Sequence, residues 1–268
     1  MPRAIKHKQL GFTLVELVMV IILLGVVGTF SSRFISDNVI LYQTSVNQNE
    51  RLNDARFVLN RMSKELDSAI AFSVTAVSNI PGQMCIQFVP FTAAGQYINN
   101  VGGQSSIELI MDPMTRSGSR AVTTFIGLRI SVLTTNADDF YITTENASDS
   151  IATISTYTAS GSQATLDLDE PLDRDSAVSR YFIAENKVQY CLRSSGDAME
   201  LSRSEASLTD SVYPLSVLMV DNLSTNSSMT LTTATQFSNA ILELSFGFLL
   251  RDGSEIKFEH QVVMTNVP

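Results

Sequence analysis

The chain has 268 residues, of which 44% are hydrophobic and 17% are charged, and its formal net charge is −9. This composition suits one folded domain, with or without an appendage, and excludes a chain that is disordered throughout. A duplex-DNA-binding protein needs a basic surface to displace counterions, so the acidic balance argues against that class.

The N-terminus combines a short basic segment with a long apolar one. Residues 1–11 read M-P-R-A-I-K-H-K-Q-L-G, and the apolar run 12–30 that follows has Glu16 as its single charge. As a helix this run would be about 28 Å long, close to the ~30 Å hydrocarbon core of a bilayer. Because the basic residues precede the run, residues 1–11 are predicted to stay in the cytoplasm and the bulk of the chain to lie outside.

Three other interpretations of the apolar run are open. A secretory signal peptide would need a small-residue cleavage site after the run, and Gly28-Thr29-Phe30-Ser31-Ser32 matches that pattern poorly. A signal peptide would also have no use for a carboxylate at Glu16. A plain uncleaved signal anchor is the second alternative. A buried helix of a cytosolic protein is disfavoured by the length and hydrophobicity of the run.

The segment K-Q-L-G-F-T-L-V-E, residues 8–16, resembles the class III leader of type IV pilins and type II secretion pseudopilins. The resemblance implies that a prepilin peptidase cuts between Gly11 and Phe12, and that the new Phe12 amine is methylated. Glu16 stands where this family carries a glutamate, which implies a role in assembly. Arg33 stands where many major pilins have a proline, and this departure predicts a less typical subunit.

Glu16 needs a partner, because a carboxylate within a membrane span costs about 2.5–3.5 kcal/mol on insertion scales. Cleavage would create that partner, the Phe12 ammonium, at the same depth. We expect Glu16 of one chain to neutralise Phe12 of a neighbour and so to set the axial register of insertion into a filament.

The helix is predicted to continue out of the membrane. Residues 36–70 contain neither proline nor glycine, and their apolar residues recur at steps of mostly three or four, which is typical of an amphipathic helix. The apolar positions are Val39, Tyr42, Val46, Leu52, Ala55, Leu59, Met62, Leu66 and Ala69. One helix from Phe12 to about Ile70 would be on the order of 90 Å long.

After residue 80 the chain changes to short runs rich in Val, Ile, Thr, Phe and Tyr, which predict β-strands separated by turns. The predicted strands are 85–91, 106–111, 122–133, 140–144, 151–158, 181–192, 198–203, 213–220, 240–250 and 256–265. Asp252-Gly253 between the last two predicts a hairpin. Residues 95–104 and 159–175 are predicted loops.

The predicted fold class is therefore α+β, a long N-terminal helix packed on an antiparallel β-rich domain. The predicted segments are a leader 1–11, a transmembrane or assembly helix 12–35, an amphipathic helix 36–70 and a β-rich periplasmic domain 71–268.

The two cysteines, Cys85 and Cys191, both fall in predicted strands. Neither has a second cysteine or a histidine at metal-ligand spacing, so the sequence contains no zinc motif. Outside the cytoplasm we expect them to form a disulfide, which would close a long loop and contribute about 3–4 kcal/mol. The alternative is two buried free thiols.

Five acidic residues fall between positions 167 and 175. Some pseudopilins bind calcium in a loop of this kind, but the spacing here lacks the glycine and the terminal glutamate of a calcium hand. A solvated acidic loop is the favoured interpretation, and calcium binding is left open. The acidic residues are Asp167, Asp169, Glu170, Asp173 and Asp175.

The sequence predicts neither an enzyme nor a cofactor site. Of the two histidines, His7 would leave with the leader, and His260 lies on a predicted strand as a surface or packing residue. There is no nucleophile elbow, P-loop or dinucleotide-binding glycine fingerprint.

Residues 215–224 and 258–268 resemble the C-terminal part of minor pilins of the mannose-sensitive haemagglutinin (MSHA) pilus system, and they are also close to J-type pseudopilins and W-type minor pilins. The resemblance implies a low-abundance subunit that primes assembly or sits at the filament tip. It also implies a single-pass inner-membrane protein whose partners are other pilin-like subunits, the prepilin peptidase and an inner-membrane assembly platform. The alternatives are a secretion pseudopilin, a tip adhesin or other binding module, and an anchored periplasmic domain that never assembles.

Overall fold

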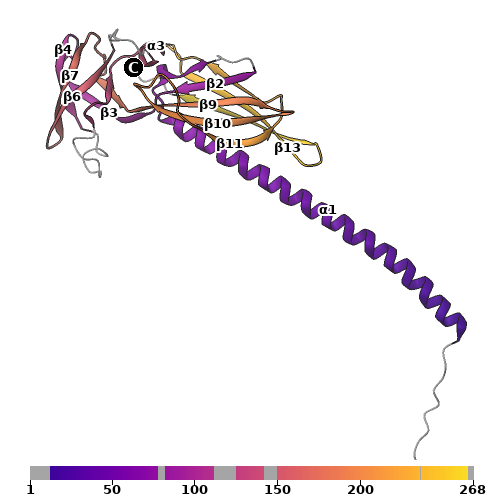
Figure 1. Cartoon of the computed structure of the whole chain (residues 1–268). Coiled ribbons are helices and arrows are strands. Elements are labelled where there is room, and N and C mark those ends of the chain that lie inside the picture. Colours follow the sequence, from indigo (N-terminus) through magenta and orange to yellow (C-terminus); the bar gives the residue numbers. More distant parts are fainter. Residues whose placement is uncertain (1–12, 78–81, 112–124, 142–149, 236, 265–268) are drawn as a thin grey trace, which may run out of the picture. The chain divides into compact units, whose positions relative to one another are not determined.

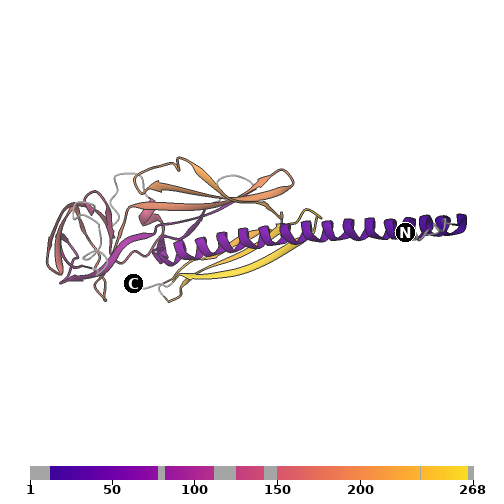
Figure 2. The same cartoon turned by 90° about the horizontal axis from the view of Figure 1, so that it is seen from below.

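The computed structural model describes residues 13–77, 82–111, 125–141, 150–235 and 237–264 (Figures 1 and 2). The chain divides into two compact units, Met1–Arg51 and Leu52–Pro268. The long helix α1 contributes to both units, and the described β-strands belong to the second. The fold class is α+β, as the sequence predicts.

The elements follow one another along the chain in this order: α1 (Leu14–Asp67), the 3-10 turn η1 (Ala71–Ser73), β1 (Thr75–Val77), β2 (Gln83–Phe88), β3 (Phe91–Ile98), β4 (Gln104–Ile110), β5 (Arg129–Ser131), α3 (Asp138–Tyr141), β6 (Ile151–Ser160), β7 (Gln163–Leu172), β8 (Arg180–Ala184), β9 (Asn186–Ser195), β10 (Ala198–Ser207), β11 (Ser216–Leu223), β12 (Ser228–Thr232), β13 (Ala240–Leu249) and β14 (Glu255–Met264).

α1 ends at Asp67 because the chain beyond it pairs with another segment. The Ile70 amide donates to the Val89 carbonyl at 3.0 Å, and the Phe91 amide donates to the Ser68 carbonyl at 2.8 Å. These bonds use backbone groups that further helical turns would need, so the helix stops three residues before its predicted end.

The C-terminal part of α1 buries one stripe against the main sheet. Ala55, Val58, Met62 and Leu66 are each at most 1% exposed, and their spacing of three and four residues is that of one helix face. Figure 2 shows this part of the helix between the orange strands of β9–β11 and the yellow strands β13 and β14. Burial of a side chain such as Met62 or Leu66 contributes about 1.5–3 kcal/mol. The predicted stripe is therefore confirmed for this half, with Val58 more deeply buried than Leu59.

The main sheet has the order β1-β2-β9-β10-β11-β13-β12, with β14 paired to β13. β13 and β14 form an antiparallel hairpin that pairs Ala240 with Met264 at one end and Leu249 with Glu255 at the other. Its turn has Gly253 at φ +82°, a conformation that glycine adopts without strain. The hairpin predicted from the Asp-Gly pair is confirmed.

A second β-structure is inserted between β2 and β9. Strands β3, β4, β7, β6, β5 and β8 close into a barrel in that order. Its interior is filled by side chains that include Tyr97, Ile107, Leu109 and Phe125, so it is a packed core and not a channel. The sequence predicts one β-rich domain over residues 71–268, and no local pattern in it indicates this insertion.

A small apolar cluster joins the barrel to the main sheet and to the end of α1. Its buried members are Ile70, Val89, Phe140, Ile151, Ala184 and Leu208. The Tyr141 hydroxyl adds a hydrogen bond of 2.5 Å to the Ser73 carbonyl. Burial raises the pKa of Tyr141 well above its ordinary value, so this hydroxyl keeps its proton and donates it.

Cys85 and Cys191 form a disulfide between β2 and β9, where the two residues face each other directly. Because the barrel is inserted between these strands, the bond closes the loop that contains the whole barrel.

Several predicted elements are wrong. Phe140 and Tyr141, predicted to begin a strand, lie in the helix α3, and residues 142–144 are outside the described residues. The predicted loop 159–175 largely forms strands β6 and β7. The predicted loop 95–104 is confirmed only at residues 99–103, between β3 and β4. In the predicted strand 122–133, the described residues form a strand only at Arg129–Ser131. The predicted strand 181–192 is divided at Glu185 into β8 and β9.

Candidate functional site: the N-terminal segment

The start of α1 is capped by Thr13. Its carbonyl accepts the amides of Glu16 at 3.1 Å and Leu17 at 3.2 Å, and its Oγ1 lies 3.3 Å from the Glu16 amide. This is the N-cap geometry, and Thr13-Leu14-Val15-Glu16 has the Thr-x-x-Glu spacing of a capping box. This capping box is absent from the features predicted above, although its spacing is readable from the sequence.

The cap places Glu16 in the first turn of α1, at the positive end of the helix dipole. Thr13 and Glu16 both lie after the predicted cut, so the residues that start the helix would remain in the processed chain. Gly11 and Phe12, the predicted processing residues, lie outside the described residues.

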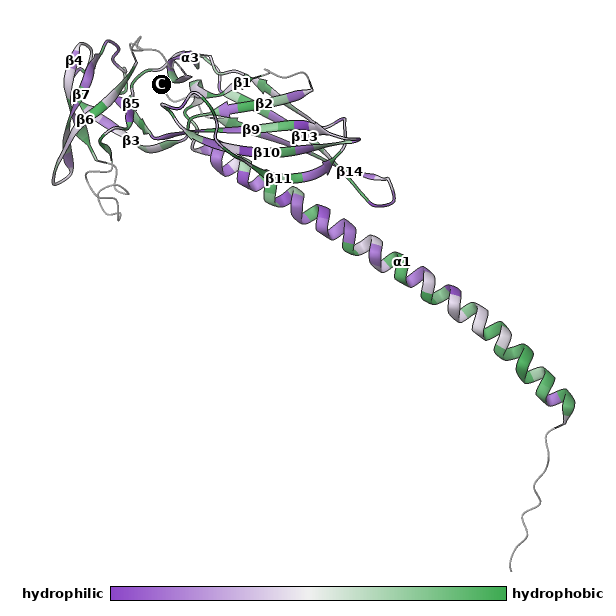
Figure 3. Ribbon diagram, viewed as in Figure 1, coloured by the Kyte–Doolittle hydropathy of each residue, from purple (hydrophilic) through white to green (hydrophobic). Residues whose placement is uncertain are grey.

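The N-terminal half of α1 is apolar and uncovered. Every residue from 14 to 35 is exposed, and examples are Leu14 at 79%, Leu24 at 65% and Phe34 at 70%. Figure 3 shows this half as hydrophobic and the C-terminal half as mixed. Among the described residues, α1 is the one helix whose length and composition would allow it to cross a membrane. A soluble surface does not carry so long an apolar stretch, so α1 is compatible with a membrane anchor.

The C-terminal end of α1 is fixed to the main sheet by a polar cluster around Glu65. The Glu65 carboxylate accepts the Tyr190 hydroxyl at 2.9 Å, and its two oxygens lie 2.9 and 3.1 Å from Arg203 Nε. Arg61 Nε, one helical turn earlier, lies 3.1 Å from the same carboxylate. Tyr190 and Arg203 face each other on β9 and β10, so one helical side chain bonds to a cross-strand pair.

The groups in this cluster shift the pKa values of one another. Burial lowers the pKa of Arg203, but the hydrogen bonds and negative charges of Glu65 and Glu205 outweigh burial and raise it. Burial, with the Glu65 charge, raises the pKa of Tyr190. The tyrosine therefore stays protonated and donates to Glu65.

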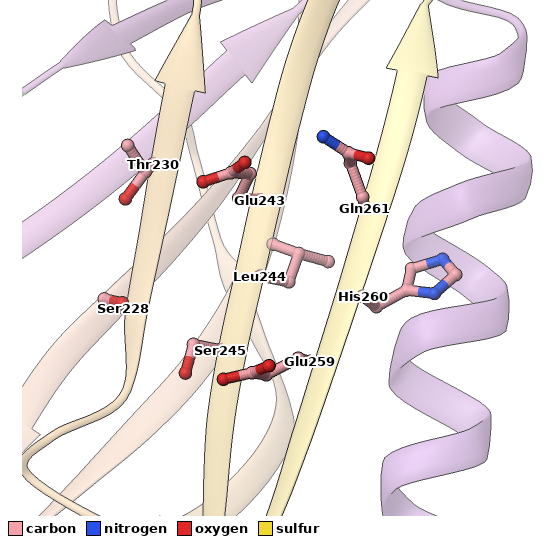
Figure 4. Close-up of a pocket in the computed structure, with 8 residues that line it drawn as sticks. All are labelled: Ser228, Thr230, Glu243, Leu244, Ser245, Glu259, His260 and Gln261. Atoms are coloured by element: carbon pink, nitrogen blue, oxygen red, sulfur yellow. The ribbon is translucent and has the colours of Figure 1, made fainter.

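A shallow cavity of ≈ 430 Å³ lies on the strands β12, β13 and β14. Figure 4 shows Glu243, Ser245 and Gln261 over the strands, with His260 directed toward α1. His260 Nε2 lies 2.8 Å from the Ser63 hydroxyl. His260 is exposed, so it is a surface residue that bonds β14 to α1, one of the two roles predicted for it.

The acidic residues 167–175 form the predicted loop only in part: Asp167, Asp169 and Glu170 lie on β7, whereas Asp173 and Asp175 lie in the irregular segment after it. Asp167 lies on β7, where it accepts the Thr156 hydroxyl at 2.7 Å. The hydrogen bond from Thr156 lowers its pKa. Asp175 accepts the Tyr97 hydroxyl at 2.6 Å, and burial together with this bond raises the pKa of Tyr97 to about 12. Within the described ranges, no group of three or more His, Cys, Asp or Glu side chains could hold a metal ion.

Comparison with known proteins gives one family match. Residues 6–32 match the family model described as "Prokaryotic N-terminal methylation motif". No curated protein matches the chain. No solved structure matches it either.

The matched residues contain Gly11, Phe12 and Glu16, and they continue through most of the exposed apolar part of α1. The chain thus carries a type IV pilin-like N-terminal signal. That signal supports a pilin-like or pseudopilin protein, and it suggests a structural, non-enzymatic subunit. It also suggests processing by a prepilin peptidase and assembly with other pilin subunits.

Proposed function

We propose that this chain is a low-abundance type IV pilin, a minor pilin that primes assembly or occupies the filament tip. The observation that carries the proposal is the methylation motif at residues 6–32 on a helix whose apolar half is uncovered. Arg33, in place of the proline of many major pilins, favours a minor subunit. The resemblance of the C-terminal part favours an MSHA-type system, in which this chain would act as an MshO-like biogenesis subunit.

In this proposal residues 1–11 are a cytoplasmic leader that the prepilin peptidase removes. Residues 12–35 then anchor the chain in the inner membrane, 36–70 continue the helix, and 71–268 form a periplasmic domain. The assembly platform moves the anchored chain into a bundle of N-terminal helices, whose cohesion is apolar packing. We propose no nucleic-acid partner, because the chain is acidic.

A type II secretion pseudopilin is the second candidate, because the same motif supports it. Deleting the gene separates the two. Loss of a surface pilus with secretion intact supports the minor pilin, and loss of secretion with the pilus intact supports the pseudopilin.

We expect the mature chain extracted from membranes to start at an N-methylated Phe12. Mass spectrometry of the N-terminal peptide measures this directly, in cells with and without the prepilin peptidase. The peptidase-deficient strain is the control and should yield the uncut chain. A start at Met1 in both strains, or a cut beyond Phe30, would contradict the proposed function.

We expect Glu16→Gln to be cleaved normally and to enter filaments at least about tenfold less than wild type. Without the carboxylate, the Phe12 ammonium of a neighbouring chain has no partner in an apolar bundle, and an unpaired charge there costs about 2.5–3.5 kcal/mol. The measurement is the amount of this chain in sheared filaments relative to membranes. Glu50→Gln, an exposed glutamate later on α1, is the matched control and should behave as wild type. Equal incorporation of Glu16→Gln and wild type would disprove the role of Glu16.

A further inference from the structure

Strand β11 has an unpaired outer edge. It pairs with β10 along its length, from Ser216 opposite Ser204 to Leu223 opposite Met199. β13 meets it at a single position, Leu223 opposite Phe248. Among the described strands, none pairs with the outer edge of residues 216–222. Backbone N–H and C=O groups on such an edge can pair with another strand.

Exposed apolar side chains lie at the start of β11 and in the segment that leads into it. Val212 is 71% exposed, Leu215 81%, Val217 62% and Leu218 55%. The sequence has no charged residue between Asp210 and Asp221. We call residues 212–218, which comprise the first residues of β11 and the segment leading into it, the β11 edge.

The other long edge strand, β14, carries charged side chains that protect it from pairing with a further strand. It pairs with β13 alone among the described strands, and its exposed side chains include Lys257 and Glu259, which form an ion pair of 2.7 Å. Charged side chains on an edge strand discourage the addition of a further strand. On β11 the residues that discourage pairing stand at the two ends, Pro214 before the strand and Asp221 near its end. Between them, residues 215–220 carry no charged side chain, which distinguishes this stretch from β14.

The β11 edge is held in place before any partner arrives. Lys187 Nζ lies 5.4 Å from the centre of the Tyr213 ring and also donates to the Asp210 carbonyl. Beyond the edge, Val220 and Leu223 are buried in the core. Because both flanks are fixed, a partner would bind a strand that is already ordered, and binding would lose little conformational entropy.

We propose that the β11 edge binds an extended, uncharged strand from the β-domain of a different subunit of the same filament. This inference rests on the proposed function. An extended backbone is the partner that completes a free strand edge, and the exposed Leu215, Val217 and Leu218 require apolar side chains on it. A strand of about six residues buries little area by itself, but two subunits held in one membrane meet at a high effective concentration.

A second copy of this chain fits the β11 edge less well. Its free β14 edge carries Lys257 and Glu259, which would lose water against an apolar strand. The β11 strand of a second copy could pair antiparallel with this β11 only if the second copy pointed in the opposite direction. Leu52, where the chain enters this unit, would then lie at opposite ends in two subunits anchored in one membrane.

The test places a photoreactive amino acid at position 217 of the full chain, in cells that assemble the filament. We expect irradiation to give an adduct whose partner, identified by mass spectrometry, carries an N-terminal methylation motif. The cross-linked peptide should come from an uncharged segment of that partner. The same photoreactive residue at Val263 on β14, which is 45% exposed, is the matched control and should give at least about fivefold less adduct.

A second pair of variants tests the effect on assembly. Val217→Lys should lower the share of this chain in filaments at least about tenfold, while Val263→Lys should leave it unchanged. Both should keep the wild-type melting temperature. The proposal is wrong if Val217→Lys assembles as wild type, or if the adduct contains a second copy of this chain or a protein without the motif. It is also wrong if the two positions cross-link equally or give no adduct.

Cleavage at Gly11–Phe12 is measured in the same cells and does not depend on β11. A chain that is never cut therefore defeats the proposed function. A chain that is cut and assembled but is insensitive to Val217→Lys defeats this inference alone.

Discussion

Replacing both cysteines with alanine should lower the free energy of unfolding by about 3–4 kcal/mol. Cys85 and Cys191 are 106 residues apart in the sequence, and cross-linking a loop of that length removes a large entropy from the unfolded chain. Alanine is the suitable replacement because both sulfur positions are buried and a serine hydroxyl would need a partner there. Urea unfolding of the full chain in detergent measures the change.

A reductant provides the control for this prediction. It should lower the stability of the wild-type chain to that of the double variant and leave the double variant unchanged. A double variant as stable as the oxidised wild type would show that the bond between β2 and β9 does not stabilise the fold.

Glu65→Ala should lower the free energy of unfolding by about 2–3 kcal/mol, which corresponds to a fall of about 5–10 °C in melting temperature. The side chains of Glu65 and Arg203 are 22% and 14% exposed, so the pair lies between a surface and a buried ion pair, and we reduce the expected loss accordingly. The loss is still large because removing Glu65 leaves Arg203 and the Tyr190 hydroxyl without their shared acceptor.

Glu205→Ala is the matched control for Glu65→Ala. Glu205 also pairs with Arg203, at 3.0 Å, but its side chain is 43% exposed, so its loss should cost less than about 1 kcal/mol. Differential scanning calorimetry of the two variants compares them directly. Equal effects would mean that Glu65 acts as a surface charge and does not hold α1 on the sheet.

The parts of the fold that follow local patterns could be predicted from the sequence. The long helix follows from the absence of proline and glycine in residues 36–67, and the final hairpin follows from Asp252-Gly253. The helix end could not be predicted to the residue, because Asp67 is followed by pairing of Ser68 and Ile70 with residues 89–91, a contact between distant parts of the chain.

The barrel could not be predicted for the same reason. Its closure depends on pairs such as Phe91 with Ala184, which are far apart in sequence and carry no local signal. The acidic stretch near Asp167 was predicted as a loop because its charges obscure the alternation of buried Leu166 and Leu168 with exposed neighbours. That alternation is readable from the sequence and is typical of a strand with one solvent-facing side.

Some residues of the candidate site could be predicted from the sequence, and others could not. Glu16 and the apolar run were recognised because they form a contiguous motif, which the family match at residues 6–32 contains. The Glu65 cluster was missed because its members come from α1, β9 and β10, and Glu65 by itself has the pattern of a solvated helical charge.

The position of the disulfide also decides how this molecule would carry mechanical load. A pull between α1 and any point after Cys191, such as β11 or β14, passes through the covalent bond from Cys85 to Cys191. The barrel strands, which lie between residues 91 and 184, are outside that covalent path. In a filament under tension, the main sheet would transmit the force, while the barrel would bear little of it and keep its fold.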